Sequence, residues 1–220
     1  MTTAAPPPPS PSSPSSDRSG LALWDQRFDR DDYLFGEAPN AFLARQAVRL
    51  PRGGTALAVA DGEGRNGVWM AEQGLAVVSV DGSAVAQAKA RRLADLRGVT
   101  LDLRLADLAA WDWPQAAFDV VAGIFIQFAG PKLRSRLFAG MIQALKPGGL
   151  LLLEGYGPRQ LDYRTGGPSV AENLYTPDLL AEAFSSLEIL ELADYDAEVS
   201  EGAGHAGRSH LVDLVARRPR

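Results

Sequence analysis

Cysteine is absent from the 220-residue chain, and histidine occurs only twice. Disulfides, thiolate metal sites and cysteine nucleophiles are therefore excluded, and we expect no histidine-rich metal site. A net charge of −5 provides no overall basic surface to neutralise phosphates, which argues against a nucleic-acid partner. The sequence also lacks an apolar run of the roughly 20 residues that span a bilayer, and its N-terminus lacks a secretory signal. We expect a cytoplasmic protein, monomeric or dimeric, that does not bind membranes.

Proline is abundant but unevenly placed. Met1–Ser16 holds six of the fifteen prolines and no charged side chain. A segment of this composition cannot bury enough apolar surface to offset its ordering entropy, so residues 1–20 are predicted to be a disordered tail. Pro8–Pro11 also has the P-x-x-P spacing of a polyproline ligand. Residues 21–220 are expected to form a single domain.

From residue 21 onward, short apolar runs alternate with amphipathic segments. This alternation implies a parallel sheet with helices on both faces, and the last two long runs predict an antiparallel pair at one end. The expected fold is α/β and Rossmann-like, a doubly wound, mostly parallel seven-stranded sheet with an antiparallel C-terminal strand. Asn40 is expected to cap the first helix, with Phe42, Leu43 and Val48 available to the core. The predicted strands cover residues 55–60, 76–80, 101–105, 118–124, 150–154, 187–198 and 209–217, and the predicted helices cover residues 40–49, 66–74, 83–96, 133–145 and 177–185.

A glycine-rich turn connects the first predicted strand to the following helix. In Gly62-Glu63-Gly64-Arg65-Asn66-Gly67, the glycines allow a sharp turn and a close approach of a ligand to the backbone. Asp81 follows at the end of the next strand, where a carboxylate can accept hydrogen bonds from both hydroxyls of a ribose. The spacing alone also fits NAD-binding proteins, or a turn without a ligand. In its strand–helix context and with Asp81, it predicts an adenosine-containing ligand.

Two later motifs extend this pattern: Phe118-Asp119-Val120-Val121, and Leu145-Lys146-Pro147-Gly148-Gly149 before an apolar strand. Together with the glycine turn they resemble class I S-adenosylmethionine-dependent methyltransferases. The resemblance implies an enzyme that transfers a methyl group from S-adenosylmethionine to a small molecule and leaves S-adenosylhomocysteine. A nicotinamide-dependent oxidoreductase stays open as an alternative, although the chain ends soon after its fifth strand. A non-catalytic adenosine-ligand-binding protein stays open as well.

Within that family the chain is most similar to the branch with the tellurite-resistance and thiopurine-type methyltransferases. Trp24–Phe28 and Tyr33–Gly36 are similar to a segment that closes over the cofactor in this branch. The resemblance therefore implies that residues 21–50 cover the cofactor, and residues 157–180 are expected to form a lid or substrate loop. It also implies an acceptor with a soft sulfur, selenium or tellurium centre.

The first motif departs from the family's usual form. An acidic residue and a glycine usually stand where this sequence has Ala58 and Ala60. Glu63, Asp61 and backbone carbonyls are therefore alternatives for holding the methionyl amino group. The residues predicted to bind the cofactor are Trp24, Tyr33, Gly62, Glu63, Gly64, Arg65, Asn66, Asp81, Gly82, Ser83, Asp107, Leu108, Ile124 and Phe125.

Candidates for catalytic residues lie in the C-terminal part. Methyl transfer from a sulfonium requires mainly positioning and exclusion of water, and a base only where the acceptor must lose a proton. His205, which lies between glycines, is predicted to be a general base near neutral pH or an exposed turn residue. Tyr156 and Arg159 follow the fifth strand, where Arg159 could bind an anionic substrate or be solvated. Ile124–Phe128 lacks the Asn/Asp-Pro-Pro-aromatic motif of many amide and adenine N-methyltransferases, which argues against such acceptors.

Overall fold

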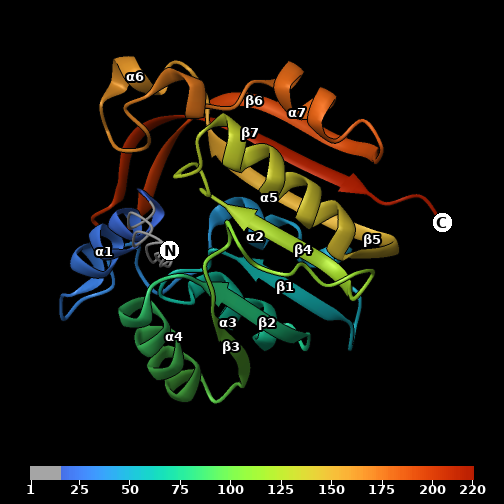
Figure 1. Cartoon of the computed structure of the whole chain (residues 1–220), viewed down its shortest axis with the longest axis horizontal. Coiled ribbons are helices and arrows are strands. Elements are labelled where there is room, and N and C mark those ends of the chain that lie inside the picture. The colour runs from blue at the N-terminus through green and yellow to red at the C-terminus, as the bar shows by residue number, and fades with distance from the viewer. Residues whose placement is uncertain (1–15) are drawn as a thin grey trace, which may run out of the picture.

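A seven-stranded sheet in the order β3-β2-β1-β4-β5-β7-β6 forms the centre of the computed structural model, which describes residues 16–220 (Figure 1). β7 runs antiparallel to β5 and β6, and the other neighbouring pairs are parallel. The predicted sheet, with its antiparallel C-terminal strand, is confirmed. The chain order reverses between β1 and β4, the place where open α/β sheets leave a crevice at the carboxyl ends of their strands. The strands are β1 (Thr55–Val59), β2 (Ala76–Asp81), β3 (Leu101–Leu105), β4 (Phe118–Ile124), β5 (Leu145–Tyr156), β6 (Glu188–Glu201) and β7 (His205–Arg217).

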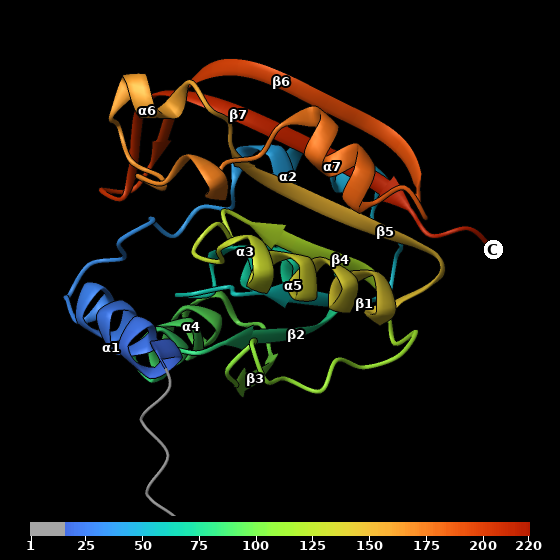
Figure 2. The same ribbon diagram turned by 45° about the horizontal axis from the view of Figure 1, so that its top comes forward.

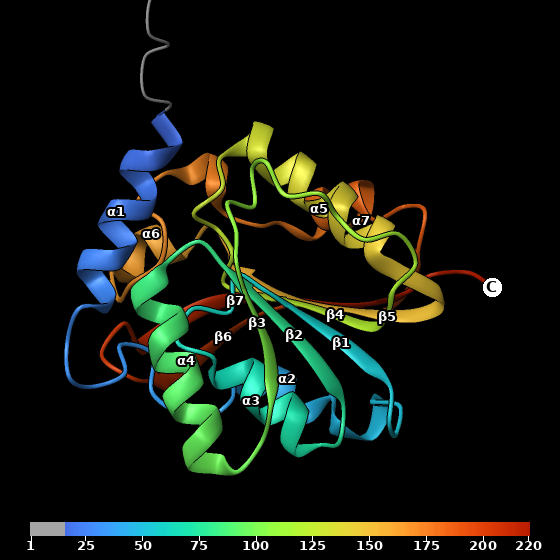
Figure 3. The same cartoon turned by 60° about the horizontal axis from the view of Figure 1, so that its bottom comes forward.

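Helices cover both faces of the sheet, with α5 and α7 on one face and α2, α3 and α4 on the other (Figure 3). Leu137 and Met141 of α5 pack on the first face, and Phe42 and Val68 on the second. Because both faces are covered, β4 and β5 consist largely of apolar residues. Within residues 16–220, no helix combines the length and the apolar character that crossing a membrane requires. The helices are α1 (Ser16–Phe28), α2 (Ala41–Arg45), η1 (Ala47–Arg49), α3 (Arg65–Glu72), α4 (Ala84–Arg97), α5 (Pro131–Ala144), α6 (Gln160–Tyr163), η2 (Ala171–Asn173) and α7 (Pro177–Ala183).

The helix expected over residues 40–49 is shorter than predicted. Asn40 caps α2 as expected, since its side chain accepts a hydrogen bond from the backbone N–H of Leu43 at 2.9 Å. Phe42 is fully buried, but Val48 is 92% exposed. The prediction for Val48 is wrong because the α-helix ends three residues earlier, and the 3₁₀ turn that follows does not continue its buried face.

Helix α1 lies at the carboxyl ends of the parallel strands, beside α4 (Figure 2). Residues 16–20, which were expected to belong to the disordered tail, are helical. Leu21, Trp24 and Phe28 recur at helical spacing and place one side of the helix over the end of the sheet, which supports its helical structure. Residues 1–15, with the P-x-x-P segment, lie outside the described residues, so the tail is still a prediction there.

Close packing between α3 and α4 explains one glycine of the turn. Gly64 has a φ of +89°, and a Cβ at this position would lie 2.6 Å from the Cβ of Ala90 in α4. Gly74 has nearly the same φ, +88°, but a Cβ there would have no neighbour within 4 Å. The two glycines therefore share a backbone conformation and differ in the space around them.

We expect Gly74→Ala to lower the free energy of unfolding by about 1–2 kcal/mol through backbone strain alone. Gly64→Ala should cost about 1–3 kcal/mol more, because its methyl group overpacks the helix contact. Urea unfolding followed by circular dichroism measures both values. Equal losses in the two variants would contradict the close approach of α3 to α4.

Candidate active site

A cavity of about 350 Å³ opens at the carboxyl ends of the strands, beneath α1. The sheet order places the residues that follow β3, β2 and β1 on one side of the cavity. Residues at the end of β4 and at the start of the antiparallel strand β7 lie on the other side. Asp107, Asp81 and Asp61 therefore belong to the first side. Phe125 and His205 belong to the second. One side is thus rich in carboxylates and the other in rings.

Asp81 is held by the backbone of the two turns that meet at the cavity. Its Oδ2 accepts a hydrogen bond from the N–H of Gly62, and its Oδ1 accepts one from the N–H of Ser83, both at 2.8 Å. Burial raises the pKa of this carboxyl. Each oxygen keeps a further lone pair, so the carboxylate can still accept hydrogen bonds from two ligand hydroxyls. Asp107 and Leu108 line the cavity beside it, as predicted.

Asp61 provides a second buried carboxylate in the cavity wall. It accepts hydrogen bonds from Ser79 Oγ at 2.8 Å and from the N–H of Gly67 at 3.1 Å. Burial raises the pKa of Asp61 to about 7. A cation in the cavity would favour its ionised form, because opposite charges stabilise each other strongly where water is excluded.

Aromatic side chains form the other side of the cavity. Trp24 stacks on Phe28 with ring centroids 5.4 Å apart, and His205 lies 4.3 Å from both Phe35 and Phe125. Burial lowers the pKa of His205 to about 3, so its imidazole is neutral at physiological pH. The expectation that His205 titrates near neutral pH, or is an exposed turn residue, is therefore wrong.

An ion pair ties this side to the glycine turn. Arg65, the first residue of α3, contacts Glu201 with an Nη2–Oε2 distance of 2.7 Å, and both side chains are nearly buried. Glu201 is the last residue of β6 and pairs across the hairpin with His205, the first residue of β7. The tip of the β6–β7 hairpin is thereby attached to the turn that follows β1.

Two non-glycine residues of the cavity have a left-handed backbone. Ala60 follows β1 with a φ of 49°, and Phe125 follows β4 with a φ of 55°. This conformation is strained for residues with a Cβ and is concentrated at functional sites. At Ala60 it also explains why related sequences usually have a glycine there, since glycine adopts positive φ without strain.

Ten of the fourteen residues predicted to bind the cofactor line the cavity, and four do not. Lys89 accounts for two of the four: it forms an ion pair with Glu63, and its carbonyl accepts a hydrogen bond from the Tyr33 hydroxyl at 3.1 Å. Gly64 serves the packing of α3 on α4, and Ser83 caps α4 by accepting from a backbone N–H. The residues that line the cavity as predicted are Trp24, Gly62, Arg65, Asn66, Asp81, Gly82, Asp107, Leu108, Ile124 and Phe125.

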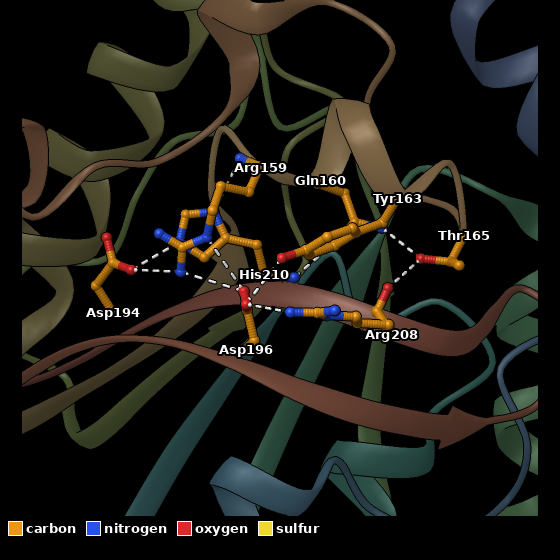
Figure 4. A network of polar contacts seen from close by, with 8 residues as sticks. All are labelled: Arg159, Gln160, Tyr163, Thr165, Asp194, Asp196, Arg208 and His210. Atoms are coloured by element: carbon orange, nitrogen blue, oxygen red, sulfur yellow. Dashed lines mark hydrogen bonds and ion pairs between the residues drawn. The ribbon is translucent and has the colours of Figure 1, made fainter.

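Arg159 points away from the cavity, into a network on the outer strands (Figure 4). Its guanidinium contacts Asp194 at 3.2 Å and Asp196 at 3.1 Å, both on β6. His210 lies buried beside it, with Nε2 2.7 Å from Asp194 and Nδ1 accepting from the N–H of Arg159. The prediction of Arg159 as a substrate-binding or catalytic residue is therefore not supported, because two aspartates already occupy its guanidinium.

Tyr156 is buried outside the cavity, with its ring centroid 4.6 Å from that of Phe125. It supports two cavity residues, Phe125 and His205, whose ring centroid lies 5.7 Å from that of Tyr156, and this does not support a direct catalytic role. No residue of segment 157–180 lines the cavity, so the structure offers α1, and not this segment, as its cover.

Several cavity residues were not singled out from the sequence. Leu21 and Phe28 lie three residues before and four residues after Trp24, and this spacing was a usable signal for one helical face. Phe28 and Phe35 also lie in the two segments that resemble the cofactor-covering part of related methyltransferases, whereas Phe128 carries no comparable signal because an irregular segment brings it to the cavity. The other residues not singled out are Gly20, Ala60, Ala106, Ala109 and Leu133.

Comparisons with known proteins agree with this geometry. Residues 56–149 match the family model described as a methyltransferase domain. One similar structure was described for the conversion of a disulfide bond into a thioacetal group during echinomycin biosynthesis (18% identity, 93% of each chain covered, TM-score 0.75). The N-methyltransferase NodS from Bradyrhizobium japonicum WM9, in complex with S-adenosylhomocysteine, is similar over 91% of this chain and 99% of its own (12% identity, TM-score 0.71). Residues 56–149 thus match a methyltransferase domain, and the chain has the fold of class I methyltransferases.

TehB from Haemophilus influenzae shares the same fold (16% identity, 90% of this chain and 67% of TehB covered, TM-score 0.68). No curated protein matches the sequence. The predicted resemblance to class I methyltransferases is confirmed, and S-adenosylmethionine is the cofactor that this resemblance implies. The nicotinamide alternative gains no support.

Replacing Asp81 with alanine should weaken the binding of S-adenosylhomocysteine by about 1–3 kcal/mol, the scale of hydrogen bonds to a charged group. Isothermal calorimetry measures this loss. Asp102→Ala is the matched control, since Asp102 lies on the neighbouring β3 with an exposed side chain. Equal affinities of the Asp81 variant and the control would contradict a ribose-binding role.

Asp61 gives the methyltransferase an expected pH dependence. Its ionised fraction rises with pH through about 7. If it faces the cofactor's ammonium group, affinity for S-adenosylmethionine should rise by up to about tenfold per pH unit below that value and then level off. Asp61→Asn should bind more weakly at alkaline pH and show a flat profile. Parallel calorimetric profiles of the two proteins would show that Asp61 does not contact the ammonium group.

Proposed function

We propose that this methyltransferase transfers the methyl group to a small-molecule acceptor whose nucleophile is a soft chalcogen, a thiol or its selenium or tellurium counterpart. One observation carries the proposal. Among the described residues that line the side of the cavity formed by β4, β7 and α1, none is a strong base, because His205 has a pKa of about 3 and its neighbours are aromatic. Because we assign Asp61, the cavity carboxylate with a pKa of about 7, to the ammonium group of the cofactor, the nucleophile must become reactive with little help from a base.

The residues of the cavity fit S-adenosylmethionine. Asp81 would accept hydrogen bonds from the ribose, Asp107 and Leu108 would contact the adenine, and Asp61 would hold the ammonium group. Gly62 has a φ of +56°, which lets the turn approach the ligand without a Cβ. The bound cofactor supplies an electrophilic methyl group, and the protein contributes orientation and exclusion of water.

Thiols suit this environment better than amines or alcohols do. A cysteine-type thiol has a pKa of about 8.5, so a small but useful fraction ionises near neutral pH without a protein base. An alkyl amine is almost fully protonated at that pH and an alcohol is not ionised, so both would need a base. The Arg65 guanidinium at the cavity wall favours an anionic nucleophile, and the rings of Phe35 and Phe125 exclude the water that would solvate it.

The similar structures support the proposal to different degrees. The one described for the conversion of a disulfide bond into a thioacetal group carries out chemistry at sulfur. NodS has the same fold and is named an N-methyltransferase. The fold therefore does not select the acceptor, and the proposal depends on the residues of the cavity.

Transfer of labelled methyl groups from S-adenosylmethionine to a panel of acceptors tests the proposal. We expect turnover with 3-mercaptopropionate, 3-mercapto-1-propanol or selenite, and none with propylamine or propanol. For a thiol, kcat/KM should rise with pH towards the pKa of the thiol itself, and His205→Phe should leave the shape of this profile unchanged. Methylation of the amine alone would refute the proposal, and an inert panel would favour a binding protein.

A further inference from the structure

Two buried polar atoms of cavity residues have no hydrogen-bond partner within residues 16–220. They are Nη1 of Arg65 and Nδ1 of His205. Both residues line the cavity, and both are more than nine-tenths buried. Buried polar groups are nearly always paired, and an unpaired guanidinium nitrogen is costly because the group is charged. A ligand that enters the cavity can supply the missing partner.

The β6–β7 hairpin brings these two groups together. Arg65 Nη2 contacts Glu201, and Glu201 lies opposite His205 at the tip of the hairpin. The charge of Arg65 also contributes to the lowered pKa of His205. His205 therefore lies at the start of β7, next to Phe35 and Phe125. Arg65 lies at the start of α3 and is linked to this end of the hairpin by its ion pair with Glu201.

Glu201 neutralises the charge of Arg65 but accepts no hydrogen bond from Nη1. Its carboxylate already accepts hydrogen bonds from Asn40 Nδ2 at 3.1 Å and from the N–H of Ala41 at 2.9 Å, besides its contact with Arg65. One edge of the guanidinium is thus fixed in place by the protein. The other nitrogen stays available beside a neutral imidazole, which has one N–H to donate.

We propose that Arg65 and His205 form a subsite for a carboxylate, or a comparable oxyanion, carried by the methyl acceptor. A guanidinium binds an oxyanion through charge-assisted hydrogen bonds, and the neutral imidazole adds a further donor. The inference rests on the proposed function and narrows it to a small thiol with an acidic oxygen. The carboxylate of the cofactor has the same chemistry and is the competing occupant. We assign the subsite to the acceptor because His205, one of its two residues, packs against Phe35 and Phe125 on the aromatic side of the cavity.

Paired acceptors and two conservative variants test the subsite. The acceptors are 3-mercaptopropionate and 3-mercapto-1-propanol, which have the same thiol and differ in the carboxylate. Arg65→Lys keeps a cation beside Glu201 but loses the planar fork, and His205→Phe keeps the ring without its nitrogens. Arg91→Gln is the control for net charge, since Arg91 lies exposed on α4.

The wild type should have a lower KM for the mercaptocarboxylate than for the alcohol. Arg65→Lys should raise the KM for the mercaptocarboxylate by about tenfold or more, since a hydrogen bond to a charged group is lost, with less than about a twofold change for the alcohol. His205→Phe should act in the same direction, and Arg91→Gln should leave both values unchanged. The affinity for S-adenosylhomocysteine should stay within about twofold in every variant.

A binding measurement keeps the test independent of turnover. Calorimetry of 3-(methylthio)propanoate and 3-(methylthio)-1-propanol on the complex with S-adenosylhomocysteine should show the same carboxylate preference and its loss in Arg65→Lys. If neither thiol is methylated but this preference is present, the proposed acceptor atom is wrong and the subsite stands. The subsite is overturned if the wild type shows no carboxylate preference. It is also overturned if Arg65→Lys lowers the affinity for S-adenosylhomocysteine and leaves the preference unchanged, since Arg65 then serves the cofactor.

Discussion

The buried ion pair between Arg65 and Glu201 joins the two parts of the chain that build the cavity. Arg65 belongs to the glycine turn after β1, and Glu201 to the hairpin that ends the sheet. Asn40 strengthens the connection, because its backbone N–H donates to Asn66 Oδ1 at 2.9 Å while its amide donates to Glu201. Removing one partner of such a pair leaves an uncompensated charge in the interior, which is strongly destabilising. The position of His205 at the hairpin tip therefore depends on this contact.

A second group of buried polar side chains supports the same hairpin from behind. Glu154 of β5 pairs in register with Asp213 of β7, and both are almost completely buried. Burial and the charge of Asp213 raise the pKa of Glu154 well above its usual value. Arg45 contacts Asp213 at 2.9 Å, and the amide of Asn40 donates to Glu154. Side chains at both ends of α2 thus contact β5 and β7 through hydrogen bonds between residues that lie far apart in the sequence.

These long-range contacts mark the boundary of what the sequence predicts. The strands, the turn and the position of Asp81 follow from apolar periodicity and glycine spacing, which are local signals. The assignments of Tyr33 and Glu63 failed because Lys89, from a helix far along the chain, engages both of them. Arg159 failed for the same reason, since its aspartate partners come from β6. A charged residue near a motif is a candidate for binding until its partners are known, and those partners are set by the tertiary fold.

The same argument applies to buried hydrogen-bond donors that have no partner in the protein. Most charged side chains around the cavity have protein partners, so a buried guanidinium nitrogen without one differs from its surroundings. The contact with Glu201 holds the guanidinium of Arg65 in place. Burial among the neighbouring rings and the charge of Arg65 lower the pKa of His205, so its imidazole is neutral. An imidazole with a pKa of about 3 is a poor base at physiological pH, but its N–H can donate a hydrogen bond. The hairpin therefore favours an acceptor that arrives as an anion and is positioned by hydrogen bonds, and disfavours one that must be deprotonated in the cavity.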